Sequence, residues 1–245
     1  MSTTAVLRSE WIKIRSLRSV SGSLLAVFLV TMVVTVLTFA TVGRAEAGDA
    51  DAELVFGAFY ALNFGQIAAI SFGATAISSE YLNGALRMSL AAVPRRTHFY
   101  LVKMSLIGGA ALAVGLITTF SSFLSGQLFM GEYAIGLGEP GALRAAFGGA
   151  IYLALMALFA AGLTALLRSA TAVLSLLIPF ILIVSFVVGD IAGGAAGYLP
   201  DRAGQLVLHQ HPEGSLGPWT GLAVTAGWAA MTLLAGWWAL RRRDA

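Results

Sequence analysis

Residues 22–42 read GSLLAVFLVTMVVTVLTFATV and contain no Asp, Glu, Lys, Arg or His. The hydrocarbon core of a bilayer is about 30 Å thick, so a helix needs roughly 20 apolar residues to cross it. The run is long enough to do so as one helix. It is apolar all round, whereas a strand of a membrane barrel would need about ten residues of alternating polarity. This stretch therefore predicts a membrane-spanning helix.

Further charge-free runs follow along the chain of 245 residues. They are Val55–Ile77, Met104–Ser125, Ala146–Leu167, Thr171–Val188 and Gly221–Leu240. The composition agrees, because only 11% of the residues are charged and 58% are hydrophobic, whereas a soluble domain carries about 25% charged residues. We predict an all-α integral membrane protein with six transmembrane helices, formed by a single transmembrane domain that comprises residues 1–245.

The uneven distribution of basic residues between the connections predicts the orientation. With the N-terminus in the cytoplasm, 12 of the 15 basic residues but only three of the 12 acidic residues lie inside. The opposite orientation would place most basic residues outside, so we expect both termini in the cytoplasm. Cleavage of the first run as a signal peptide is disfavoured, because the run exceeds the roughly 7–15 residues of a typical apolar signal core.

Residues 1–21 have the pattern of a helix that lies on the inner membrane surface. Leu7, Trp11 and Ile14 recur at the spacing of one helix face, and tryptophan suits the headgroup layer. Glu10 falls within this apolar sector and interrupts it. We prefer an N-terminal amphipathic surface helix; the alternative is a basic flank that only orients the first span.

The connection between the second and third spans, residues 78–103, reads SSEYLNGALRMSLAAVPRRTHFYLVK. Gly84 and Pro94 are natural helix boundaries, and the stretch Ala85–Ala92 between them predicts a short helix with its own apolar stripe. A positive loop that only fixes the topology needs no such helix. A docking element for a cytoplasmic partner is therefore the competing interpretation, and the residues alone leave both open.

The outer connection, residues 189–220, contains a candidate interfacial helix at Asp201–Leu208, followed by His209 and His211. Two histidines without cysteine do not complete a typical metal site, so we expect no metal. The chain also lacks the P-loop pattern G-x-x-x-x-G-K-[ST], and GLGEPG at residues 136–141 has no strand before it. We therefore expect no catalytic residue, no cofactor bound by the chain itself and no nucleic-acid partner.

No ionisable residue lies within the apolar runs, which disfavours the proton relays of many transporters. Pro179 should kink the fifth span, because it removes one hydrogen bond and clashes with the preceding turn. Small residues let helices approach closely. We expect such packing at Gly108, Gly109, Gly148, Gly149 and Gly162.

Several short motifs occur in a characteristic order. They are Glu10-Trp11-Ile12-Lys13 before the first span, Ser79-Glu80-Tyr81-x-x-Gly84 after the second, and Leu90-x-x-x-Pro94-Arg95-Arg96 with Lys103 before the third. Together with the six-span order and the Arg-rich C-terminus, they make the whole chain resemble the permease subunits of ABC-2 type ATP-binding-cassette exporters, the membrane halves of type V exporters.

The resemblance implies a multi-pass protein of the bacterial cell membrane that exports its substrate by alternating access. Two six-span subunits, identical or different, would pair in the lipid bilayer, each on a separate ATP-binding subunit that carries ATP and Mg²⁺. Residues 78–103 would form the coupling loop, and residues 189–220 an extracellular loop. The implied coupling residues are Glu80, Gly84, Arg87, Leu90, Pro94, Arg95 and Arg96. The implied substrate path, along the dimer axis, would include Phe59, Asn63, Gln66, Phe180 and Phe186.

Three other classes of protein compete with this interpretation. A secondary transporter would show an internal repeat or a buried ion pair, and the sequence indicates neither. A membrane-embedded enzyme would need clustered ionisable residues at lipid depth. A scaffold or immunity protein that does not transport needs only spans and a docking loop, so the sequence leaves this class open.

Overall fold

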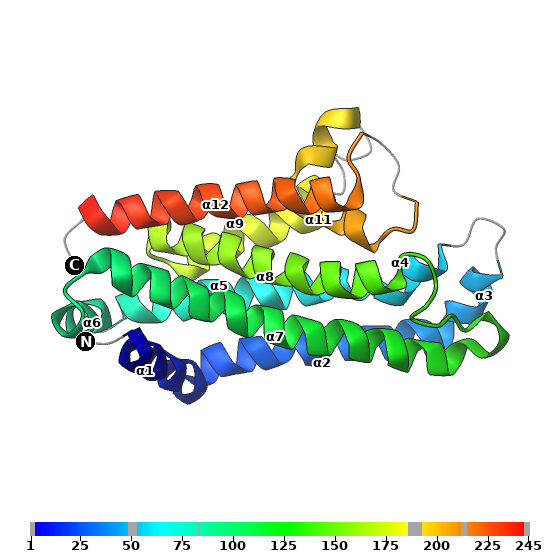
Figure 1. Cartoon of the computed structure of the whole chain (residues 1–245), viewed down its shortest axis with the longest axis horizontal. Helices are drawn as coiled ribbons and strands as arrows, with labels where there is room; N and C mark the ends of the chain where they lie inside the picture. The colour runs from blue at the N-terminus through cyan, green and yellow to red at the C-terminus, as the bar shows by residue number, and fades with distance from the viewer. Residues whose placement is uncertain (1–2, 49–52, 83, 186–192, 212–214, 243–245) are drawn as a thin grey trace.

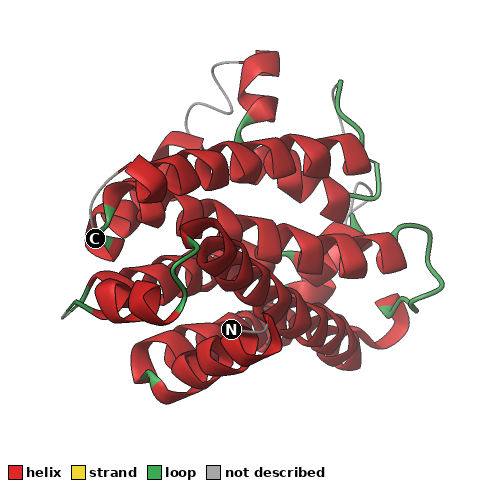
Figure 2. Cartoon of the chain, turned by 60° about the vertical axis from the view of Figure 1, so that its left-hand side comes forward, coloured by secondary structure: helices red, strands yellow, loops and turns green. Residues whose placement is uncertain are grey.

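The computed structural model describes residues 3–48, 53–82, 84–185, 193–211 and 215–242. Within these ranges the chain forms helices and connections, without strands, and the long helices run side by side as a bundle (Figure 1, Figure 2). The helices are α1 (Thr3–Ser16), α2 (Arg18–Thr41), α3 (Gly43–Ala47), α4 (Leu54–Phe59), α5 (Leu62–Tyr81), α6 (Ala85–Ala92), α7 (Arg96–Met130), α8 (Ala142–Leu167), α9 (Ala170–Pro179), α11 (Pro200–Gln205) and α12 (Pro218–Arg242). Short 3-10 turns are η1 (Gly131–Tyr133), η3 (Gly193–Tyr198) and η4 (Leu206–Leu208), and η2 (Phe180–Ser185) is a π-helix.

Among the described residues, five helical segments are long and apolar enough to cross a membrane. They are Arg18–Thr41, Leu54–Tyr81, Arg96–Tyr133, Ala142–Leu167 and Pro218–Arg242. These segments correspond to the first four predicted spans and the sixth, and they indicate a multi-pass membrane protein. The predicted fifth span appears as the shorter α9, and its last residues lie outside the described part of the chain.

The fifth predicted span changes its helix type at the proline. The regular α-helix α9 ends at Pro179 and η2 follows it directly. Proline donates no backbone hydrogen bond and clashes with the preceding turn, which accounts for a break at this position. A change from α-helix to π-helix is therefore present at Pro179, while the predicted kink of the fifth span stays a prediction.

Helix α8 occupies the centre of the bundle and packs against α5, α7 and α12. Small residues permit this: a Cβ atom on Gly162 would lie 2.6 Å from the backbone nitrogen of Leu233. Close packing is likewise confirmed at Gly148 and Gly149. The prediction is wrong for Gly109, because no described atom lies within 4 Å of a Cβ atom built there.

Helices α1 and α6, the start of α7 and the end of α12 lie together at one end of the bundle (Figure 1). We call this the α6 end. The opposite end holds α3, α4, η3 and α11 (Figure 1). The predicted inner connections therefore gather at one end of the molecule.

The segment after η3 is helical, as expected, and it is buried in the bundle. Val207 and Leu208 are fully buried, and α11 packs against α12 and α8. The segment therefore packs inside the bundle, and its predicted location at the membrane interface stays a prediction. Beyond it, His209 Nδ1 lies 2.7 Å from Glu53 Oε2. In the described part of the chain, no three His, Cys, Asp or Glu side chains gather as metal ligands.

Candidate functional site

Helix α6 begins and ends where the sequence predicts, at Ala85 and Ala92. Gly84 adopts a φ of 73°, a conformation that glycine tolerates without steric cost, and so turns the chain into α6. Leu86 is buried against the bundle. The opposite face of α6 exposes Arg87, Met88 and Ala91. Met88 is 76% exposed.

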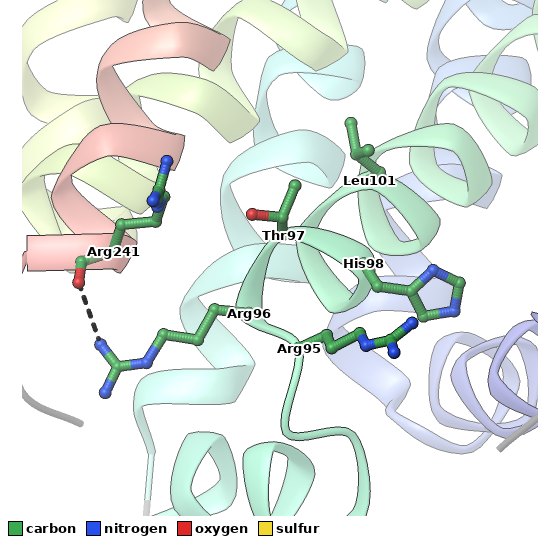
Figure 3. A pocket seen from close by; sticks show the side chains of 6 residues that line it. All are labelled: Arg95, Arg96, Thr97, His98, Leu101 and Arg241. Atoms are coloured by element: carbon green, nitrogen blue, oxygen red, sulfur yellow. Dashed lines mark hydrogen bonds between the residues drawn. The ribbon is translucent and has the colours of Figure 1, made fainter.

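The other predicted coupling residues around α6 differ in their exposure. Leu90 is half-buried and packs against the core, whereas Pro94 and Arg95 are exposed. Arg96 reaches toward the end of α12 (Figure 3), where its Nη1 atom donates to the Leu240 carbonyl at 2.9 Å. The exposed coupling candidates are therefore Gly84, Arg87, Pro94 and Arg95.

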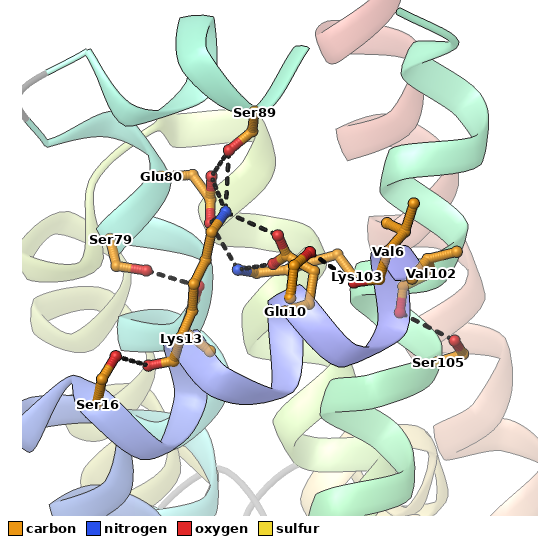
Figure 4. A network of polar contacts seen from close by, with 12 residues as sticks. Val6, Glu10, Lys13, Ser16, Ser79, Glu80, Ser89, Val102, Lys103 and Ser105 are labelled. Carbon is orange, nitrogen blue, oxygen red and sulfur yellow. Dashed lines mark hydrogen bonds and ion pairs between the residues drawn. The ribbon is translucent and has the colours of Figure 1, made fainter. Parts of the chain in front are cut away.

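A cluster of four charged side chains lies beneath α6, and we call it the buried charge cluster (Figure 4). It consists of Glu10 and Lys13 from α1, Glu80 from α5 and Lys103 from α7. Lys103 Nζ lies 2.6 Å from Glu10 Oε2 and 2.7 Å from Glu80 Oε1. Because the Lys103 side chain is only 2% exposed, water contributes little to holding its charge.

Lys13 and Ser89 complete the hydrogen bonding of the cluster. Lys13 Nζ lies 2.7 Å from Glu10 Oε1 and 3.0 Å from Glu80 Oε1. It also donates to Ser89 Oγ on α6 at 2.9 Å, and that hydroxyl donates to Glu80 Oε2 at 2.9 Å. Ser89 thus attaches α6 to the cluster through two hydrogen bonds.

The cluster contains two positive and two negative charges, so its formal charges cancel. Burial by itself lowers the pKa of Lys13, but the hydrogen bond to Glu10 and the charges of Glu80 and Glu10 outweigh it and raise that pKa above its usual value. Removing one member of a buried ion pair leaves an uncompensated charge, which is strongly destabilising. The cluster therefore holds α1, α5, α6 and α7 in one arrangement.

Comparison with known proteins shows the family of the chain. The family described as "ABC-2 family transporter protein" matches residues 6–188. The chain belongs to the ABC-2 transporter family. No curated protein and no solved structure matches it. The matched range of this ABC-2 protein includes the entire buried charge cluster and α6.

The sequence motifs predict a coupling role for Glu80 in this ABC-2 protein, and that role stays a prediction; they did not predict that Glu10, Lys13 and Lys103 lie together with it. We expected no buried ion pair from the sequence, and that expectation is wrong. The error arose because Lys103 and Glu80 lie just outside the apolar runs, where charged side chains are ordinarily solvated. The one feature of the sequence that pointed to a buried ion pair was Glu10, because its carboxylate lies within an apolar sector of the helix.

Helix α1 of the ABC-2 protein has the predicted position in the sequence, and it also packs one of its faces on the bundle. Val6, Glu10 and Ile14 are buried, whereas Trp11 is exposed. Of the residues predicted to face the membrane surface, Trp11 stays exposed, whereas Ile14 packs on the bundle, so the predicted Leu7–Trp11–Ile14 set is divided between two faces. The polar partner of Glu10 on α7 accounts for the difference, because the carboxylate must face Lys103.

The predicted substrate-path residues do not share one surface. Phe59 is fully buried, with its ring 5.6 Å from that of Phe123. Gln66 is buried and accepts a hydrogen bond from the Tyr152 hydroxyl. Both side chains are therefore buried within the single chain, and their predicted place on a substrate path stays a prediction. Asn63 and Phe180 are half-buried, and Phe186 lies outside the described residues.

Proposed function

We propose that this ABC-2 protein is the membrane-spanning permease subunit of an exporter in the cell membrane. A separate ATP-binding subunit would dock on the exposed face of α6. The observation that carries the proposal is the buried charge cluster, because it ties α6 to α1, α5 and α7 immediately behind that face. A docking element with such rigid attachment suits the transfer of motion into the bundle.

In the proposed mechanism, ATP and Mg²⁺ bind to the partner, and two ATP-binding subunits close on each other. Each would move one α6, and Ser89 would carry that displacement to Glu80 and Lys13 through its hydrogen bonds. The long helices α5 and α7 would then tilt, and a path between two permease subunits would open outward. The chain performs no covalent chemistry in this scheme.

The proposal includes six membrane crossings and cytoplasmic termini. Helix α9 leads away from the α6 end, and the chain reaches η3 and α11 at the opposite end before α12 returns (Figure 1). A crossing through α9, η2 and the residues that follow would account for this course. Exposed Trp11 and Ile12 on α1 would contact lipid at the inner surface.

The buried ion pairs are the feature that a secondary transporter would share. They lie at the α6 end, however, and each positive charge is matched by a negative one. A proton or ion relay requires ionisable groups along the membrane interior, and the apolar runs contain none. The cluster therefore supports a mechanical role more than ion coupling.

The docking proposal can be tested with a matched pair of substitutions. Ala91 lies on the exposed face of α6, and Ala134 is exposed beyond η1, at the other end of α7. We expect Ala91→Asp to weaken co-purification of the proposed ATP-binding subunit and to reduce nucleotide-driven transport. Ala134→Asp should change neither. Leu90→Asp is less suitable, because Leu90 packs against the core.

Equal effects of both substitutions, or none from Ala91→Asp, would contradict docking on α6. An intact complex that hydrolyses ATP but moves no amphiphilic compound from a broad panel into inverted vesicles would instead favour a scaffold or immunity role. Uphill transport by the chain alone would favour a secondary transporter.

A further inference from the structure

The start of α7 and the end of α12 border an open hollow of about 530 Å³ at the α6 end (Figure 3). Its lining consists of Arg95, Arg96, Thr97, His98, Leu101 and Arg241. Small-molecule sites usually have volumes of roughly 300–1,000 Å³. The hollow is therefore large enough for a polar headgroup, and none of the described residues that line it is acidic.

Basic residues of the hollow lie at the N-terminal end of α7, where the helix dipole disfavours positive charge. Arg95 directly precedes α7 and His98 lies in its first turn, which contains no acidic residue. The N-terminus of a helix carries a partial positive charge that favours anions over cations. Within the described residues, no side-chain hydrogen bond or ion pair involves Arg95 or His98, and the two lie next to each other (Figure 3). An anion in the hollow would be attracted by the guanidinium group of Arg95 and by the partial positive charge at the start of α7.

Contacts between α7 and α12 fix the walls of the hollow. Arg96 Nη1 donates to the carbonyls of Leu240 at 2.9 Å and Arg241 at 3.5 Å. The Trp237 indole donates to Thr97 Oγ1 at 3.1 Å. The hollow is thus held by both helices and does not depend on one mobile side chain.

The surroundings place the hollow at the depth of lipid headgroups. Leu101, only one turn beyond the basic residues, is 60% exposed, and α7 continues from there as an apolar span. On α12, the Arg241 guanidinium lies 4.9 Å from the Trp237 ring and that of Arg242 lies 4.5 Å from the Trp238 ring. Tryptophan and arginine are typical of the membrane–water interface.

We propose that this hollow binds the phosphate-bearing headgroup of an anionic lipid, with Arg95, His98 and Arg241 around the phosphate and the acyl chains along Leu101. Basic pockets between transmembrane helices bind such headgroups in the same way. The bound lipid would join the start of α7 to the end of α12. The proposal does not depend on the ATP-binding partner, and it gives Arg95 a ligand other than that subunit.

Native mass spectrometry of the purified full chain in neutral detergent tests the proposal. Phosphatidylglycerol and phosphatidylcholine with the same acyl chains serve as probes, and we expect tighter binding of phosphatidylglycerol. Arg95→Gln should weaken that binding about five-fold, and His98→Gln should weaken it in the same direction. Arg15→Gln, an exposed change on α1 at the same end, is the matched control and should leave it unchanged.

Inorganic phosphate is the third probe, and it distinguishes a site for a lipid headgroup from a site for a free anion. The proposal predicts that phosphate at the same concentration does not displace phosphatidylglycerol, because it lacks the acyl chains that contact Leu101. Displacement by phosphate would overturn a lipid site. Equal affinity for the two lipids, or an equal loss in Arg15→Gln, would also overturn the proposal. A melting curve for each variant separates loss of binding from loss of folding.

Discussion

Lys103 is the residue on which the buried charge cluster depends most. Its ammonium group lies between the carboxylates of Glu10 and Glu80, and its side chain is 2% exposed. Two nearby carboxylates repel each other unless a cation lies between them. Lys13 also contacts both, but its side chain is 35% exposed, so water screens its contribution.

We therefore expect Lys103→Met to reduce the free energy of unfolding by about 3–5 kcal/mol, because it leaves the two carboxylates with Lys13 alone. The half-exposed Lys13→Met change is the matched control and should cause a smaller loss. Thermal unfolding in detergent measures both. Equal losses would show that burial of Lys103 does not decide the stability of the cluster.

A double variant tests whether the two charges act as a pair. Glu10→Gln with Lys103→Met removes one negative and one positive charge together, so it should be less destabilised than the sum of the two single variants. Simple addition of the two losses would contradict direct coupling between Glu10 and Lys103.

The raised pKa of Lys13 predicts a pH dependence. Its contribution to stability should be fully present below the ordinary lysine pKa of about 10.4, and it should be lost as the pH rises through the higher value of the folded protein. The difference in melting temperature between the unchanged chain and Lys13→Met should therefore be constant near neutral pH and shrink above that value. A difference that grows with alkaline pH would contradict this sign.

Glu10 shows what a sequence reveals at the residue scale. A carboxylate within an apolar helix sector looks like an imperfection until its partner is known. Lys103 is distant from Glu10 in the sequence, and helix periodicity carries no information on such pairs. The cluster could therefore be recognised only when α1 and α7 had been placed side by side.

At the scale of elements, boundaries were easier to predict than faces. Gly84 and Pro94 delimit α6 by backbone chemistry that is local to the chain. The burial of Glu10 and Ile14 on α1 and of α11 in the bundle depends on neighbouring helices, and the local pattern did not predict it. Local signals define where a helix begins and ends, whereas its packing partners decide which side is buried.

Two glycines in membrane helices provide a matched test of helix packing. A Cβ atom on Gly162 would meet the backbone of α12 at 2.6 Å, whereas one on Gly109 would meet no described atom within 4 Å. We expect Gly162→Ala to destabilise the protein by about 1–3 kcal/mol through overpacking. Gly109→Ala should be neutral or stabilising, since alanine is the better helix former. Melting temperatures of the two variants measure the difference. A lower melting temperature for Gly109→Ala than for Gly162→Ala would contradict the α8–α12 packing.

For the whole molecule, the apolar runs predicted the helical membrane bundle, and five of the six runs appear as full-length spans. The substrate-path residues could not be predicted in the same way, because an aromatic side chain in a span looks the same in sequence whether it faces lipid, a second chain or the core. Phe59, packed on Phe123, is an example.

The six-crossing topology predicts the side from which single cysteines react. The chain has no cysteine of its own, so Ser9→Cys, Ala134→Cys and Ala195→Cys can each be labelled with a membrane-impermeant reagent in oriented vesicles. Ala134→Cys and Ala195→Cys should react from the same side, and Ser9→Cys from the other. Reaction of Ala195→Cys from the side of Ser9→Cys would show that α9 does not lead across the membrane.

The most direct test of the central claim is a crosslinking measurement on the assembled complex. A photoreactive group is attached to a single cysteine at Ala91→Cys on α6 or, as the control, at Ala134→Cys beyond η1. The account predicts nucleotide-sensitive crosslinks to the ATP-binding subunit from position 91 and none from position 134. Crosslinks from position 134 alone, or a stable complex that yields none from position 91, would contradict it.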